Sequence, residues 1–206
     1  AKYLAEKMGY TFEVHQIDWD SLPVALQSNK IDCVIAGQSI TAERLQTVDF
    51  TTPYYYASIV GLTNNSSNYA SATGVADLKG ATCTSQINTV WYDVCLPQIE
   101  NANILPAMET APQMLVSLNS GKTDLIVTDM PTAMAATKVY PEMKILDFTN
   151  SQDNFKVSDE EINIGISVKK GNSELLNSLN TALSTLTTDD FERMMNDAIT
   201  VQPLSN

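Results

Sequence analysis

One stretch of this sequence is repeated in outline 92 residues further along the chain. The first copy covers residues 25–35, with the sequence ALQSNKIDCVI, and the second covers residues 117–127, with the sequence SLNSGKTDLIV. Each copy has the pattern of a helix end, a turn that contains a lysine, an aspartate and a buried strand. Two copies are too few for a solenoid, which stacks several repeats. We therefore expect two lobes built on the same α/β plan.

Elsewhere in the chain, short apolar runs alternate with amphipathic segments, which is the pattern of βαβ units with parallel strands. In the first lobe we expect a strand over residues 11–17, a helix over residues 21–28 and a strand over residues 31–36. Ser21 is the expected N-cap of this helix, and Pro23 suits its first turn.

Polar stretches indicate where the chain passes from one lobe to the other. We expect hinge segments near residues 62–67 and 152–162. Lobe one is then discontinuous, with residues 1–63 and 162–206, and lobe two consists of residues 64–161. Leucines with helical spacing predict two C-terminal helices that pack on lobe one.

Charge and cysteine content exclude several classes of partner. The net charge is -12 and only Arg44 and Arg193 are arginines, so the clustered cations of a nucleic-acid-binding protein are missing. A single histidine and cysteines without paired spacing indicate no metal site, and no cofactor is expected. Cys33 has the pattern of a buried small hydrophobe. Cys83 and Cys95 either form a disulfide in an oxidising compartment or stay buried as thiols.

Two residues of opposite charge follow the two repeated strands. Ligands of open parallel α/β sheets bind at the carboxyl ends of the strands. Arg44 lies at one such end, in a first helical turn that Thr41 can cap, and Asp129 lies at the other. A cation and an anion in these positions match the two charges of a zwitterion. On the residues alone, Arg44 is equally explained by a surface ion pair with Glu43 or Asp49, and Asp129 by an N-cap.

A longer motif surrounds Arg44. The run over residues 31–55, IDCVIAGQSITAERLQTVDFTTPYY, resembles the signature of the bacterial family 3 solute-binding proteins, which deliver polar amino acids to ABC importers. The resemblance continues over residues 77–80, 121–129 and 165–172, and so covers nearly the whole chain. It implies an α/β fold with two Rossmann-like lobes joined by a two-segment hinge, the type II periplasmic binding protein fold.

The resemblance also implies how the ligand backbone is held. Arg44 would bind the α-carboxylate through its guanidinium fork, and Ser39 would donate a hydrogen bond beside it. The carbonyl group of Gly37 would face the α-ammonium, and Asp129 would supply the counter-charge from lobe two.

Further site residues follow from the same resemblance. Trp19 would flank the ligand side chain, although a core aromatic is an equal alternative. Gln38 would influence which amino acid is bound. Thr89 would be a further carboxylate donor or, as the alternative, a helix N-cap. It belongs to a turn in which Asn88 replaces the usual glycine, and asparagine tolerates a positive φ better than most residues.

Family members open with a strand and a loop that contact the ligand side chain, whereas this sequence opens within the following helix. We therefore expect the first strand of lobe one to be missing, and a neighbouring chain could supply it by strand exchange. The resemblance implies an extracytoplasmic location, in the periplasm or on the cell surface as a lipoprotein. An ABC transporter permease is the expected partner, and contact with the membrane is expected only through a lost anchor or a fused permease.

Two other functions fit parts of the pattern. An enzyme of the dehydratase kind, acting on a small carboxylate, would need an acid or base, and His15, Asp93 and Glu109 are the candidates. These three form no recognisable constellation. The ligand-sensing domain of a membrane receptor would share the fold and the binding residues. We expect a binding protein without catalytic residues.

Overall fold

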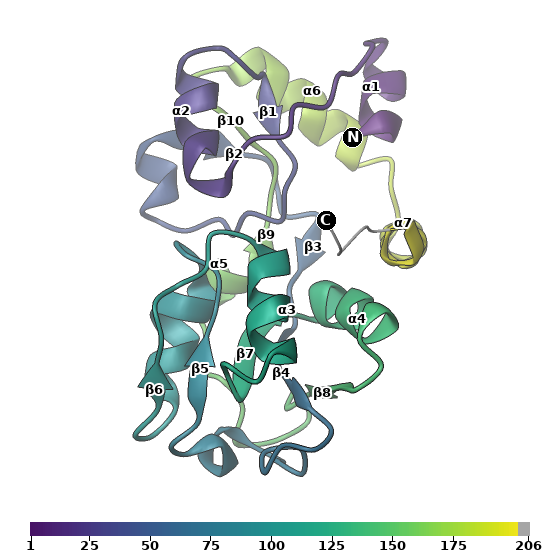
Figure 1. Cartoon of the computed structure of the whole chain (residues 1–206). Helices are drawn as coiled ribbons and strands as arrows, with labels where there is room; N and C mark the ends of the chain where they lie inside the picture. Colours follow the sequence, from purple (N-terminus) through teal and green to yellow (C-terminus); the bar gives the residue numbers. More distant parts are fainter. Residues whose placement is uncertain (202–206) are drawn as a thin grey trace. The chain divides into compact units, whose positions relative to one another are not determined.

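The computed structural model describes residues 1–201 of the chain. The chain forms two compact units (Figure 1). Unit 1 contains Ala1–Ala57 and Ser158–Met194, and unit 2 contains Ser58–Val157 and, of the described residues, 195–201. Each unit has its own sheet and its own buried core. Among residues 1–201, none of the helices combines the length and the hydropathy that a membrane span requires.

Unit 1 is built on a three-stranded sheet in the order β1-β10-β2, in which neighbouring strands are antiparallel. Ser167 of the central strand lies opposite both Val34 and Phe50. A separate pair, β3 with β9, is also antiparallel. The elements of this unit are α1 (Lys2–Met8), α2 (Leu22–Gln27), β1 (Cys33–Val34), β2 (Val48–Phe50), β3 (Tyr55–Tyr56), α5 (Asp159–Ile162), β9 (Asn163–Ile164), β10 (Ser167–Lys169), α6 (Ser173–Leu183) and the first half of α7 (Thr188–Val201).

Apolar side chains cover both faces of this sheet. On one face, α1 and α6 pack over β10, with Leu4, Val168 and Leu179 among the buried residues. On the other face, α2 packs over β1 and β2, with Leu26 and Phe50 among the buried residues. The helix α2 has the position expected from Ser21 and Pro23, with Pro23 in its first turn.

Unit 2 is built on a five-stranded sheet in the order β6-β5-β7-β4-β8. The strands β6, β5 and β7 are parallel to one another, whereas β4 is antiparallel to both of its neighbours. The elements are β4 (Ile59–Asn64), β5 (Thr82–Thr84), β6 (Asn103–Ile104), α3 (Ala111–Asn119), β7 (Leu125–Asp129), α4 (Met130–Val139) and β8 (Met143–Leu146). Three short turns of other helix types complete the unit, at Val75–Leu78, Trp91–Cys95 and Leu96–Gln98.

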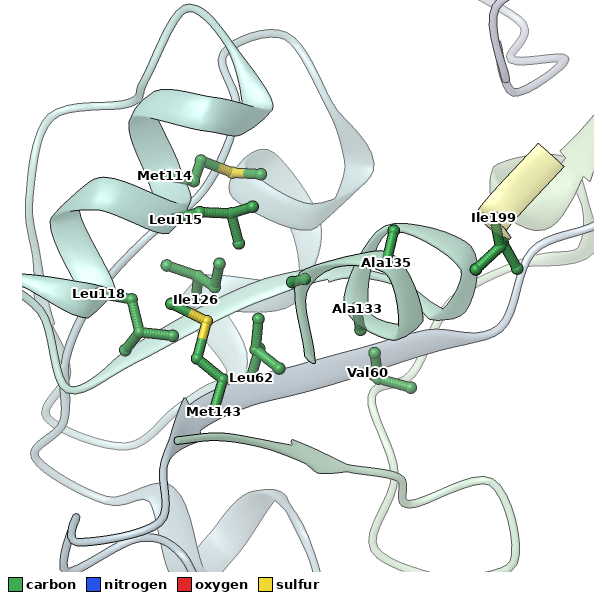
Figure 2. Close-up of a cluster of buried hydrophobic side chains, with 11 residues drawn as sticks. Val60, Leu62, Met114, Leu115, Leu118, Ile126, Ala133, Ala135, Met143 and Ile199 are labelled. Atoms are coloured by element: carbon green, nitrogen blue, oxygen red, sulfur yellow. The ribbon is translucent and has the colours of Figure 1, made fainter. Parts of the chain in front are cut away.

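The core of unit 2 lies where α3 and α4 cover one face of this sheet (Figure 2). Val60 and Leu62 alternate along β4 and are both fully buried. Ile199, from the second half of α7, is 5% exposed and belongs to the same cluster. The labelled side chains in Figure 2 are Val60, Leu62, Met114, Leu115, Leu118, Ile126, Ala133, Ala135, Met143 and Ile199.

The two repeated segments have the expected order of elements, since α2 leads into β1 and α3 leads into β7. The strand expected over residues 11–17 is absent, and this segment is irregular. A single extended segment needs a neighbouring strand to pair its backbone groups, and residues 11–17 have none among residues 1–201. The expectation of parallel neighbours was wrong in unit 1, because β10 inserts antiparallel between β1 and β2.

The units also differ in extent from the lobes expected from the sequence. The whole of β4 belongs to unit 2, because its backbone is hydrogen-bonded between β7 and β8. The helix α7 is divided between the units: Phe191 packs against Tyr54 in unit 1, whereas Met195 and Ile199 pack in the core of unit 2. Residues 202–206 of the predicted lobe one lie outside the described residues.

Candidate functional site

The loop that follows β1 begins with a left-handed glycine. Gly37 has a φ of 70°, which favours a residue without a Cβ atom, and a Cβ atom added there would meet nothing within 4 Å. Tyr54 lies against this turn. Burial raises the pKa of the Tyr54 hydroxyl to about 12, against the smaller lowering effect of a backbone hydrogen bond from Gly37.

Ser39 is the next predicted site residue along this loop. It is 9% exposed and forms an isolated bridge with Ile164, so its backbone is fixed to the edge of β9. Its carbonyl oxygen accepts a hydrogen bond from Nη1 of Arg44 at 2.9 Å. The serine and the arginine are therefore already in contact in the ligand-free chain.

Arg44 begins a short 3-10 turn, Arg44–Gln46. The hydroxyl oxygen of Thr41 accepts a hydrogen bond from the Arg44 backbone N–H at 3.3 Å, but the N-cap of the turn is Glu43 and not Thr41 as expected. The Arg44 guanidinium carbon lies over the ring of Trp19, 5.7 Å from the ring centroid. Thr41 thus holds the backbone of Arg44, the Ser39 carbonyl holds its guanidinium group in the plane, and the Trp19 ring covers one face of that group.

Asp49 is one of the two acidic residues, with Glu43, that we considered as ion-pair partners of Arg44. It pairs with Lys170 at 2.8 Å and accepts a hydrogen bond from the Gly171 N–H at 2.7 Å. The hydrogen bonds from Lys170 and from Gly171, in that order, lower the pKa of Asp49.

Trp19 is half-buried and opens the 3-10 turn Trp19–Ser21. It packs against the buried cluster of α2, β1 and β2, which contains Leu22 and Phe50. The tryptophan is therefore partly a core aromatic, as the alternative interpretation has it, and it also contacts Arg44.

Gln38, expected to influence which amino acid is bound, has a buried side chain that contacts β10. Gln38 is 6% exposed, and its Oε1 atom accepts a hydrogen bond from the Ser167 hydroxyl at 2.6 Å. Its backbone carbonyl accepts from the N–H of Gly165 at 3.1 Å. Both groups thus connect the loop to the segment around β10. We did not predict this role for Ser167, although a serine within the apolar run over residues 164–168 is a signal that a buried hydroxyl needs a partner.

In unit 2, Asp129 ends β7 and caps α4. Its carboxylate accepts a hydrogen bond from the Thr132 N–H at 2.8 Å, so the N-cap that we considered as an alternative is present. Burial of this carboxyl group raises its pKa, and the hydrogen bonds from Thr132 offset only part of that effect. Burial therefore makes the ionised form of this carboxyl group less favourable than it is in water.

Thr89 lies in a turn of unit 2 that follows β5. Asn88 has a φ of 55°, so this asparagine adopts the left-handed backbone that we expected it to tolerate. The Thr89 hydroxyl donates to the carbonyl oxygen of Gln86 at 2.7 Å and accepts from the N–H of Tyr92 at 3.4 Å. It therefore closes this turn in the manner of an N-cap.

The candidate acids and bases are not brought together. His15 is in unit 1, 3.5 Å from Glu13, whereas Asp93 and Glu109 are exposed residues of unit 2. Within residues 1–201, no three His, Cys, Asp or Glu side chains gather into a group that could hold a metal ion.

The cysteine alternatives are resolved in favour of thiols. No disulfide joins Cys83 and Cys95, and both are fully buried. Burial raises the pKa of the Cys83 thiol to about 11. Cys33, expected to be buried, is only half-buried, at the edge of the cluster between β10 and α6.

Comparison with known proteins places these features in a family. The sequence profile of the bacterial extracellular solute-binding proteins, family 3, matches residues 1–198. The chain belongs to this family. The family resemblance of residues 31–55 is thus confirmed. The name of the family describes its members as extracellular solute-binding proteins.

Individual relatives agree with the assignment. The solute-binding protein is 29% identical to ABC transporter arginine-binding protein 1 of Escherichia coli (strain K12) over 202 residues, which is 96% of this chain and 77% of that one. It is 39% identical over 90 residues to the arginine-binding extracellular protein ArtP of Bacillus subtilis (strain 168), a match that spans only 34% of ArtP and 44% of this chain.

A solved structure confirms the expected α/β fold of type II periplasmic binding proteins. The holo form of ArgBP from T. maritima has a TM-score of 0.75 and 26% sequence identity, and the match covers 94% of this chain and 81% of that one.

Proposed function

We propose that this solute-binding protein binds an amino acid through its α-carboxylate and α-ammonium groups and delivers it to an ABC importer. The observation that carries the proposal is the guanidinium group of Arg44, which contacts both the Ser39 carbonyl and the Trp19 ring. Relatives whose names state arginine or cystine binding support an amino acid as the ligand class. The cystine-binding relative, TcyJ of Escherichia coli (strain K12), is 25% identical over 92% of this chain and 67% of that protein.

Unit 1 offers the chemistry for the carboxylate. A guanidinium group restrained by the Ser39 carbonyl and the Trp19 ring can bind a carboxylate through two parallel hydrogen bonds. Restraint of the arginine side chain lowers the conformational entropy that binding would otherwise cost. The left-handed Gly37 beside it leaves open space above the loop, which suits a carbonyl that accepts from an ammonium group.

Unit 2 offers the chemistry for the ammonium. Burial raises the pKa of the Asp129 carboxyl group, because the hydrogen bonds from Thr132 compensate only part of the cost of burying its negative charge. An α-ammonium would supply that compensation and favour the ionised carboxylate. Thr89 is the further carboxylate donor in this proposal, through a hydroxyl that already closes its own turn. We place Gln38 in a supporting role, because Ser167 occupies its side-chain oxygen.

The proposed role involves no catalysis. It includes a permease as the partner and a location in the periplasm or, as a lipoprotein, on the cell surface, in line with the extracellular family. A neighbouring chain is a further proposed partner, which would supply the first strand of lobe one by strand exchange. Concentration-dependent dimerisation would support the exchange, and a monomer at all concentrations contradicts it.

A thermal-shift screen of the common L-amino acids and L-cystine tests the proposed function. A ligand that binds only the folded state raises the Tm as its concentration rises above its Kd. We expect at least one amino acid to raise the Tm, and calorimetry to give a stoichiometry of one. The same mixtures, followed by chromatography, should contain unchanged amino acid. Absence of any shift, or turnover of a bound carboxylic acid, contradicts the proposal.

A further inference from the structure

Trp19 and Arg44 lie in different segments of unit 1 and meet through their side chains. The guanidinium carbon of Arg44 is 5.7 Å from the centroid of the Trp19 ring, within the range of about 6 Å for a cation–π contact. The ring acts on the face of the guanidinium group, whereas the Ser39 carbonyl, 2.9 Å from Nη1, acts in its plane. Two restraints in different directions fix both the position and the tilt of the group.

The tryptophan is itself held by the core. Trp19 packs against the cluster of α2, β1 and β2, so its ring has little freedom to move with Arg44. The backbone of Arg44 is held as well, because its N–H donates to the Thr41 hydroxyl and β2 follows at Val48–Phe50. The Trp19 ring, held by this cluster, therefore provides the surface on which the Arg44 side chain packs.

We infer that Trp19 is a positioning residue, which sets the guanidinium plane of Arg44 for a bidentate contact with the carboxylate of the ligand. In this role the Trp19 ring raises the affinity for every amino acid by a similar factor, because all amino acids share the α-carboxylate that Arg44 binds. A residue that only flanks the ligand side chain would instead affect ligands according to their side chains. The inference rests on the proposed function for its effect on affinity, but the Trp19–Arg44 contact itself is independent of any ligand.

The sequence makes the contact accessible to NMR, because Arg44 and Arg193 are the only arginines. Assignment of their Nε–H signals needs one variant, Arg193→Lys. In the ligand-free protein, the ring current of Trp19 should shift the Arg44 signal, and Trp19→Leu should remove that shift. Trp19→Phe should restore part of it, because a phenyl ring keeps an aromatic face under the guanidinium group.

Affinity provides the second measurement. With L-arginine, L-histidine and L-cystine as probes, Trp19→Leu should weaken every measurable affinity by a similar factor, roughly 3- to 10-fold, which is about the effect of one cation–π contact. Trp19→Phe should recover part of this loss. Leu22→Ala is the matched control, since Leu22 is buried in the same cluster and its truncation lowers stability without removing the ring. It should leave the Arg44 signal and the affinities unchanged.

The outcomes separate this inference from the proposed function. An Arg44 signal that Trp19→Leu does not move, or affinity losses that follow the ligand side chain, overturns the positioning role while amino-acid binding stands. Absence of binding in the wild-type protein overturns the proposed function, and the NMR comparison then still shows whether the ring orders the arginine. If Trp19→Leu does not fold, Trp19→Phe and Leu22→Ala carry the comparison, and equal signals in both overturn the inference.

Discussion

Asn29 and Gly121 occupy equivalent positions in the two repeated segments, and both adopt a left-handed backbone, with φ values of 56° and 72°. In each copy the next residue, a lysine, donates its backbone N–H to the carbonyl five residues earlier, Ala25 in one copy and Ser117 in the other. The repeat therefore encodes one way of ending a helix before a strand begins.

The first prediction concerns these two turns. Gly121→Ala and Asn29→Ala should each lower the free energy of unfolding by about 1 kcal/mol, because a Cβ atom disfavours the left-handed backbone. At Gly121 the cost is conformational, since an added Cβ atom would meet nothing within 4 Å. Urea denaturation measures the change. Asn29→Gly is the control and should keep or raise the stability; a loss as large as that of Asn29→Ala would show that the asparagine side chain matters instead.

The second prediction concerns the pH dependence of stability. Burial raises the folded-state pKa of Asp129 above its unfolded value, which is about 3.9 for an aspartate. The folded state therefore holds this proton more strongly, and the stability that it contributes is complete below about pH 4 and is lost as the pH rises through the folded pKa. Asp129→Asn keeps an N-cap and removes the titration.

Urea denaturation of the ligand-free protein at several pH values measures this effect. The free energy of unfolding of the wild type, minus that of Asp129→Asn, should fall as the pH rises above about 4 and through the raised pKa of Asp129. Calorimetry should show weaker amino-acid binding by the variant at neutral pH. A difference that is independent of pH would mean that the carboxylate is already compensated, and wild-type affinity would remove Asp129 from the site.

The third prediction separates two roles for Gln38. Gln38→Ala and Ser167→Ala should each lower the free energy of unfolding by about 1–3 kcal/mol, because each leaves a buried polar group without its partner. The double variant should lose less than the sum. Calorimetry below the Tm should give an unchanged ligand affinity for Gln38→Ala. Weakened binding without a loss of stability would favour the influence on ligand choice that we expected of Gln38.

Local sequence patterns predicted the parts of this protein that depend on neighbouring residues. The helix–turn–strand repeat and the left-handed Asn88 are both decided within a few residues. The partner of Gln38 is 129 residues away, and no local pattern identifies it. The same is true of β10, whose place between β1 and β2 depends on pairing of Ser167 with Val34 and Phe50.

The strand expected over residues 11–17 illustrates a second limit of local patterns. Its alternating apolar residues are typical of a strand, but a strand forms only where a neighbour accepts and donates its backbone hydrogen bonds. Phe12 and Val14 are exposed, and the segment is irregular. The residues of this segment favour a strand, but a strand forms only if a neighbouring strand pairs with it.

The central claim is that Arg44 binds the ligand carboxylate, and calorimetric titration of Arg44→Ala with the amino acid that the wild type binds tests it most directly. Loss of a charged, hydrogen-bonded partner should weaken binding by roughly two orders of magnitude or more. Arg44→Lys should recover only part of the affinity, because an ammonium group lacks the planar fork. The matched control is Arg193→Ala, the other arginine, which is exposed and paired with Asp190 at 3.2 Å. The account predicts wild-type affinity for Arg193→Ala alone, and wild-type affinity for Arg44→Ala would contradict it.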